Sequence, residues 1–200
     1  MEKPDLASVY CSLLEDIRKR LRLVRNVVDG SLDLGSEVSN YEFVSVQLRK
    51  CLEMIAFGSL SANQPEYEKV HANFREHWNA RRMLATVRKV NPGFYPKPVF
   101  VAKETPGPTR QFHFDYVKEG FLTESELVEL YDHCSKVIHA RNPFADWSTI
   151  HFRLSVSAWT DRIEALLRLH LIRLSGSQTI WLARLQDIDG RAHVATASPT

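Results

Sequence analysis

Residues 41–63, YEFVSVQLRKCLEMIAFGSLSAN, form the stretch that decides the fold we predict. Successive residues of a helix are about 100° apart, so one face of this stretch would carry apolar side chains at Tyr41, Val44, Leu48, Leu52 and Ile55. Further apolar side chains cover most of the other faces. A helix that is apolar nearly all round usually lies at the centre of a fold. We therefore expect a central helix around which the other helices pack.

Three charged residues interrupt this apolar surface. Glu42, Arg49 and Glu53 lie close to one line along the helix, and Arg49 and Glu53 are four residues apart. Charges that are partly buried must find partners, or they cost stability. These residues therefore indicate either a polar site or a structural ion pair.

Length and composition bound the class of protein. The 200 residues, 44% of them hydrophobic, are enough for one core, and a net charge of +2 is too small for a protein that coats nucleic acid or a membrane. Cys11, Cys51 and Cys134 are widely spaced and odd in number, which favours free thiols in a reducing compartment. No apolar run reaches the length of a membrane span, and the N-terminal residues lack the pattern of a signal peptide. We expect a cytoplasmic protein with no membrane partner.

Helical periodicity predicts further helices on both sides of the central one. The first spans 5–28 with Asp5 as its cap, and the central helix would be capped by Ser39 or Asn40. A third helix starts at Pro65 and runs to about Val90. A fourth begins at the capping box of residues 123–126, and a long fifth spans roughly 147–174, with His170 on its apolar face as a core residue.

Two segments have the pattern of β-hairpins instead. Residues 92–108 hold five of the nine prolines, which excludes a helix there, and alternating aromatics predict a hairpin at about 94–118. Asp189-Gly190 predicts the turn of a second hairpin near the C-terminus. The fold class is thus mainly α: a single-domain bundle of about five helices, residues 1–177, with an inserted hairpin, followed by a C-terminal hairpin and tail at 178–200.

A polar cluster can be assembled from the central and fourth helices. If the fourth helix continues to Arg141, that residue points toward Glu53 on the central helix. The cluster would consist of Arg49, Glu53, His139, Arg141 and Asn142, in a cleft that binds phosphate or performs acid–base chemistry. The alternative is an ion-pair network that sets the angle between two helices, because such networks perturb buried charges as readily as active sites do.

This layout, Arg49 and Glu53 on a central helix opposite the motif His139-Ala140-Arg141-Asn142, resembles the HEPN superfamily of small helical bundles. The resemblance covers about residues 5–90 and 120–174. It implies a nucleic-acid or nucleotide context, such as a bacterial defence or toxin–antitoxin system. Ribonucleases of that superfamily carry an arginine, then four to six residues, then a histidine. This chain has no such spacing, and His139 precedes Arg141, so the resemblance favours a non-catalytic binding module.

Basic residues form a second candidate site. Arg18, Arg22 and Arg25 make one stripe on the first helix, and such a stripe can follow a phosphate backbone. Glu15 and Asp16 lie close to it, however, and a charged helix face is often only solvated. RNA or a nucleotide is therefore one candidate partner.

Three hypotheses remain from the sequence. The first is the binding module, with Arg49, Glu53, Asn142 and the basic stripe as binding residues. The second is a ribonuclease that uses His139 as general base and Arg141 or Arg49 to stabilise the developing charge. The third is an adapter that self-associates as a homo-oligomer or binds a protein through its hairpins or first helix. Histidine spacing does not fit a metal site, and no cofactor motif is present, so we expect neither.

Overall fold

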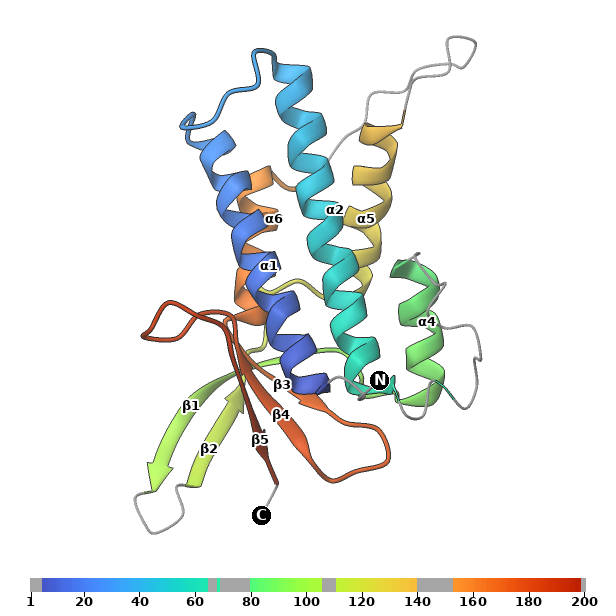
Figure 1. Cartoon of the computed structure of the whole chain (residues 1–200), viewed down its shortest axis with the longest axis vertical. Coiled ribbons are helices and arrows are strands. Elements are labelled where there is room, and N and C mark those ends of the chain that lie inside the picture. The colour runs from blue at the N-terminus through green and yellow to red at the C-terminus, as the bar shows by residue number, and fades with distance from the viewer. Residues whose placement is uncertain (1–4, 65–67, 69–79, 106–110, 140–152, 199–200) are drawn as a thin grey trace.

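The computed structural model describes residues 5–64, 68, 80–105, 111–139 and 153–198, and in it a bundle of helices stands on one end of a β-sheet (Figure 1). The helices of this part are α1 (Leu6–Val28), α2 (Glu37–Ala62), α4 (Ala80–Val90), α5 (Glu124–Ile138) and α6 (Val156–Leu167). The strands are β1 (Lys97–Thr105), β2 (Gln111–Tyr116), β3 (Leu169–Arg173), β4 (Ile180–Arg184) and β5 (His193–Ala197). The mainly α class is confirmed, but the sheet is larger than predicted.

Helix α1 follows its sequence pattern closely. The Asp5 carboxylate accepts hydrogen bonds from the backbone of Ala7 and Ser8, as expected of an N-cap. It buries Tyr10, Leu14, Ile17, Leu21 and Val24, which recur at helical spacing, whereas Val28, which we also expected on the apolar face, is exposed. This stripe packs against α2, and Arg25 bridges from the end of α1 to α6.

Helix α2 is the predicted central helix, because it packs against α1, α4 and α5. The predicted caps Ser39 and Asn40 are wrong: the helix begins at Glu37, and the extended residue Ser36 accepts a hydrogen bond from the Ser39 backbone. The longer helix leaves Tyr41, which we expected inside, half exposed. Near its other end Gly58 faces Tyr10 so closely that a Cβ at this position would lie 2.4 Å from the tyrosine ring.

The two predicted hairpins exist, but they are parts of one sheet rather than separate appendages. The antiparallel strand order is β2-β1-β3-β4-β5, so β3 joins the β1–β2 hairpin to the β4–β5 hairpin. The predicted helix at 147–174 is therefore wrong in its last part, and residues 147–152 lie outside the described residues. Helix α6 starts after its cap Ser155 and stops at Leu167, because the next residues pair with β4.

Helix α5 begins as predicted and ends earlier. Thr123 and Glu126 form the reciprocal capping box, and Arg153 and Arg162 both bind the same Glu126 carboxylate. The helix stops at Ile138, and His139 has extended backbone angles. The condition under which Arg141 would point toward Glu53, a helix that continues to Arg141, is therefore not met. Of the predicted third helix, the residues from Ala80 to Val90 are helical, and most of 65–79 lies outside the described residues.

His170 joins the sheet to the bundle. It is a core residue, as predicted, but it lies on β3 rather than on a helix, and it is fully buried. Its Nδ1 lies 3.1 Å from the Leu167 carbonyl, which can only accept, so Nδ1 carries the proton. Nε2 then accepts a hydrogen bond of 2.6 Å from the Tyr10 hydroxyl of α1. Both ring nitrogens are satisfied in the neutral form, and burial lowers the pKa of His170 to about 4.

This environment predicts a loss of stability in acid. The pKa of His170 is about 4 in the folded protein against an ordinary value of 6.5, so between these pH values the unfolded chain binds a proton that the folded protein excludes. The stabilisation is complete above pH 6.5 and is lost as the pH falls toward 4. One pKa unit corresponds to about 1.4 kcal/mol, so the free energy of unfolding should fall by about 3 kcal/mol through this residue. Urea denaturation of wild type and His170→Gln at several pH values measures this contribution to the free energy of unfolding. If the free energies of the two proteins depend on pH in the same way, the prediction is wrong.

Candidate functional site

The Arg49 side chain connects α2 to α5. Its Nε lies 3.1 Å from a Glu53 carboxylate oxygen on the same helix. Its Nη1 and Nη2 donate hydrogen bonds, each of 3.0 Å, to the hydroxyls of Ser135 and Tyr131 on α5. The guanidinium also stacks over the Tyr131 ring at 4.7 Å, and about a quarter of the Arg49 and Glu53 side chains is exposed.

The protonation state of this cluster follows from its contacts. Burial is the largest single influence on Arg49 and disfavours its charge, but the hydrogen bond to Glu53 and the nearby Tyr131 outweigh it and raise the pKa of Arg49. Burial also raises the pKa of Tyr131, so its hydroxyl keeps its proton. The cluster is therefore a permanent cation between a carboxylate and two neutral hydroxyls. Each guanidinium nitrogen has a partner inside the protein.

The other members of the predicted cluster are not brought to Arg49 by α5. Tyr131 and Ser135, rather than His139, are the α5 side chains that contact it. His139 is exposed at the end of the helix, and Arg141 and Asn142 lie outside the described residues. Sequence reasoning missed Tyr131 and Ser135, although their spacing of four residues on one helix face could have indicated a joint contact.

The predicted basic stripe on α1 divides into three different environments. Arg18 binds Glu15 at 2.7 Å, one turn earlier on the helix. Arg25 binds Glu164 and Asp161 of α6, and these hydrogen bonds raise its pKa. Arg22 is exposed and has no ion pair among the described residues. Arg25 is thus a structural bridge, Arg18 is mostly buried beside Glu15, and Arg22 is exposed.

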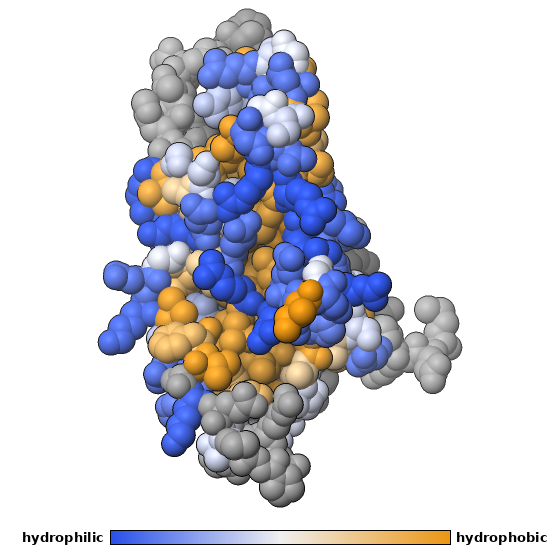
Figure 2. Space-filling view, turned by 90° about the vertical axis from the view of Figure 1, so that its left-hand side faces the viewer, coloured by the Kyte–Doolittle hydropathy of each residue, from blue (hydrophilic) through white to orange (hydrophobic). Residues whose placement is uncertain are grey.

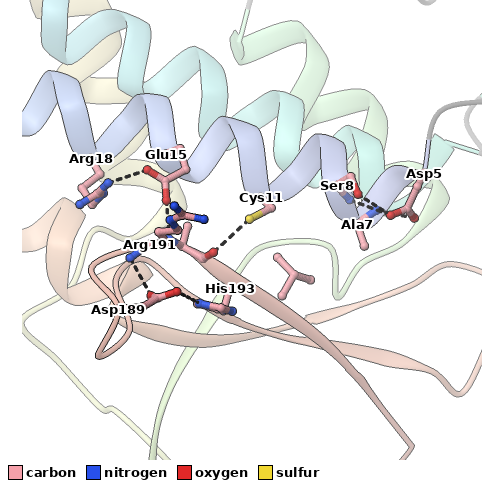
Figure 3. A pocket seen from close by; sticks show the side chains of 11 residues that line it. Asp5, Ala7, Ser8, Cys11, Glu15, Arg18, Asp189, Arg191 and His193 are labelled. Carbon is pink, nitrogen blue, oxygen red and sulfur yellow. Dashed lines mark hydrogen bonds and ion pairs between the residues drawn. The ribbon is translucent and has the colours of Figure 1, made fainter.

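Arg18 also lines an open hollow of about 680 Å³ between α1 and the β4–β5 turn with the start of β5 (Figure 3). Sequence reasoning did not find this hollow, because its two walls are far apart in the chain. One wall consists of α1 residues from Asp5 to Arg18, and the other is formed by Asp189, Arg191, Ala192, His193 and Val194. Asp5 lies at one end in Figure 3, and Arg18 with the residues of the β4–β5 turn lies at the other.

Ala192 holds the two walls together. Its backbone N–H donates to the Glu15 carboxylate, and its carbonyl accepts from the Cys11 thiol at 3.1 Å. Asp189 in turn accepts from the Arg191 backbone at 2.9 Å and pairs with His193 at 3.0 Å. These contacts fix the turn against α1 and place the Arg191 side chain at the rim.

The titratable groups of the hollow have well-defined charges. The backbone hydrogen bond from Ala192, followed by Arg18, lowers the pKa of Glu15, so that carboxylate stays ionised. Burial, with a smaller contribution from the charge of Glu15, raises the pKa of Cys11. The thiol is therefore protonated at neutral pH and acts as a hydrogen-bond donor. A nucleophilic cysteine would need the opposite shift.

The described residues show neither a metal-binding cluster nor a membrane-spanning helix. No group of three or more His, Cys, Asp or Glu side chains in this part is placed to hold a metal ion. None of the helices described here combines the length and apolar content that a bilayer span needs.

The geometry of the Arg49 cluster predicts a stabilising role. Arg49→Met keeps much of the apolar stem but removes the hydrogen bonds to Tyr131, Ser135 and Glu53. Because about a quarter of each charged side chain is exposed, water weakens the pair, and the free energy of unfolding should fall by about 1–2 kcal/mol. The control Arg22→Met, at an exposed position of α1, should change it by less than about 0.5 kcal/mol. Equal stability of both variants in urea denaturation would show that Arg49 is not structural.

Comparison with known proteins gives this chain no family: no protein-family model matches it, and no curated protein or solved structure shows significant similarity to it.

Proposed function

We propose that this protein is a non-catalytic binding module for a phosphate-bearing ligand, RNA or a nucleotide. The observation that carries the proposal is the convergence of arginines from two distant segments on one open hollow. Arg18 comes from α1 and Arg191 from the β4–β5 turn, and both line it. This context agrees with the resemblance to non-catalytic HEPN-like proteins of bacterial defence and toxin–antitoxin systems.

The two arginines continue into a longer basic track. Arg22 lies one helical turn beyond Arg18 on α1, and both Arg22 and Arg191 are exposed without an ion pair among the described residues. We call Arg22, Arg18 and Arg191 the basic track. Arg22 and Arg191 are exposed, and about a fifth of the Arg18 side chain is exposed beside Glu15. Neighbouring guanidinium groups can contact successive phosphates, and such contacts release counterions from the nucleic acid.

The carboxylates beside the basic track support it structurally. Glu15 binds Arg18 and the backbone of Ala192, and Asp189 binds His193 and the backbone of Arg191. Both carboxylates therefore already have donors: Glu15 holds the Arg18 side chain, and Asp189 holds the backbone at Arg191. Asp5, the remaining acid of the hollow, caps α1 at the far end.

The chemistry of the side chains favours binding over catalysis. The Cys11 thiol is held protonated, and the Arg49 guanidinium is engaged on three nitrogens within the protein. Neither group is prepared to attack or to stabilise a reacting phosphate. His139 is exposed and accessible, so the ribonuclease alternative is tested in the same experiment.

The proposal predicts salt-sensitive binding of RNA through the basic track. Fluorescence anisotropy with a labelled single-stranded RNA should show affinity that falls steeply between about 50 and 200 mM salt. Arg22→Ala/Arg191→Ala should weaken binding at every salt concentration and reduce the slope of log affinity against log salt by about two. The matched control is Arg168→Ala/Arg173→Ala, which removes two exposed arginines that do not line the hollow.

Three outcomes are decisive. Absence of binding at low salt, or equal weakening in the control, would contradict the proposal. Competition by a free mononucleotide would identify the nucleotide as the preferred ligand. Cleavage of the same RNA on a denaturing gel, lost in His139→Ala, would favour the ribonuclease instead.

A further inference from the structure

We propose that two copies of this chain pair through strand β2, antiparallel and centred on Phe114, so that one sheet runs through both copies. This inference uses a different surface from the basic track and does not rest on the proposed function.

Strand β2 is an edge of the sheet. Its one neighbour in the strand order is β1, whereas β5, at the opposite edge, lies against α1. An edge strand presents a row of backbone N–H and C=O groups that can pair with another chain. In Figure 1 the β1–β2 hairpin extends away from the helices.

The apolar face of the hairpin is exposed to an unusual degree. Phe112, Phe114 and Tyr116 alternate along β2 and share one face, where Val101 of β1 lies opposite Phe114. Phe112 is 40%, Tyr116 58% and Val101 43% exposed. The rings of Phe112 and Phe114 are 6.0 Å apart. Figure 2 shows apolar side chains gathered at the end of the molecule that carries the sheet, and burial of such surface would drive association.

Symmetry restricts how β2 can pair with itself. Along an edge strand, alternate residues direct their backbone N–H and C=O outward, so paired residues of two antiparallel copies must both direct these groups outward or both inward. The twofold axis must then pass through a position at which a residue lies opposite the same residue of the second copy. The registers in which most of β2 overlaps with its copy are centred on His113, Phe114 or Asp115.

Charge selects among these three registers. Centring on His113 or on Asp115 would place that residue opposite its own copy, which juxtaposes two histidines or two carboxylates. Centring on Phe114 places His113 opposite Asp115 of the second copy, twice over by symmetry. The same register puts Phe112 opposite Tyr116 of the second copy and Phe114 opposite its counterpart, which forms cross-strand aromatic pairs. The strand is therefore complementary to itself in one register.

Sedimentation equilibrium of the full chain tests the pairing. Wild type should be dimeric at about 100 µM, and Phe114→Lys should be monomeric because the charge falls on the twofold axis. Tyr41→Lys, at a half-exposed aromatic on α2, is the control and should remain dimeric. Circular dichroism should show that all variants stay folded. A monomeric wild type would overturn the proposal and leave the β2 edge to a strand of a different protein.

A charge exchange tests the register. His113→Asp alone places like charges opposite each other at both symmetric positions and should raise the dimer dissociation constant by about tenfold or more. His113→Asp/Asp115→His exchanges the two residues and should restore the wild-type constant. If the single variant dimerises as well as wild type, or if the exchange does not restore the dimer, the register centred on Phe114 is wrong.

Discussion

The hydrogen bond between Tyr10 and His170 is the interaction on which the arrangement of the molecule depends. It joins α1 to β3 inside the core, where neither side chain reaches water. A buried polar group without a partner is costly, so these two residues stabilise the fold only when helix and strand meet in this one way. Gly58 admits the Tyr10 ring against α2, and Trp181 of β4 lies 5.6 Å from the same ring. One tyrosine thus contacts α2, β3 and β4.

A second polar link also connects the helices to the sheet. Asn91, at the end of α4, donates to the side chain of Asn63 at the end of α2 and to the carbonyl of Arg173 at the end of β3. Both links connect helices to β3, the central strand of the sheet. The two surfaces that we propose for binding follow from this anchoring. With β3 fixed, the β4–β5 turn meets α1 and encloses the hollow, whereas β1 and β2 extend away from the bundle.

The parts of the fold that could be predicted from the sequence are those that local patterns specify. The Asp5 cap and the stripe from Tyr10 to Val24 define α1, and the capping box at Thr123 defines the start of α5. Strand β3 could not be predicted in this way. In residues 169–173, LHLIR, the leucines also continue the helical spacing of the preceding residues, and only pairing with residues 180–184 makes the segment extended. Tertiary pairing here overrides the local pattern.

The candidate sites likewise combine contacts that local spacing could predict with contacts that depend on tertiary packing. The contact of Arg49 with Glu53 is local and follows from their spacing, but the contacts with Tyr131 and Ser135 depend on how α5 docks. Arg18 was predicted as part of a basic stripe, yet its neighbour Arg191 is 173 positions away and could not be inferred without the sheet. The predicted role of His139 depended on a helix that ends one residue before it.

The buried link through His170 should make the helices and the sheet one cooperative unit. Native-state hydrogen exchange tests this, because it reports the opening free energy of each amide. Amides of β3 and of α1 should exchange with the same free energy, equal to that of global unfolding. Exchange of β3 at a clearly lower free energy than α1 would show instead that the sheet opens independently of the helices.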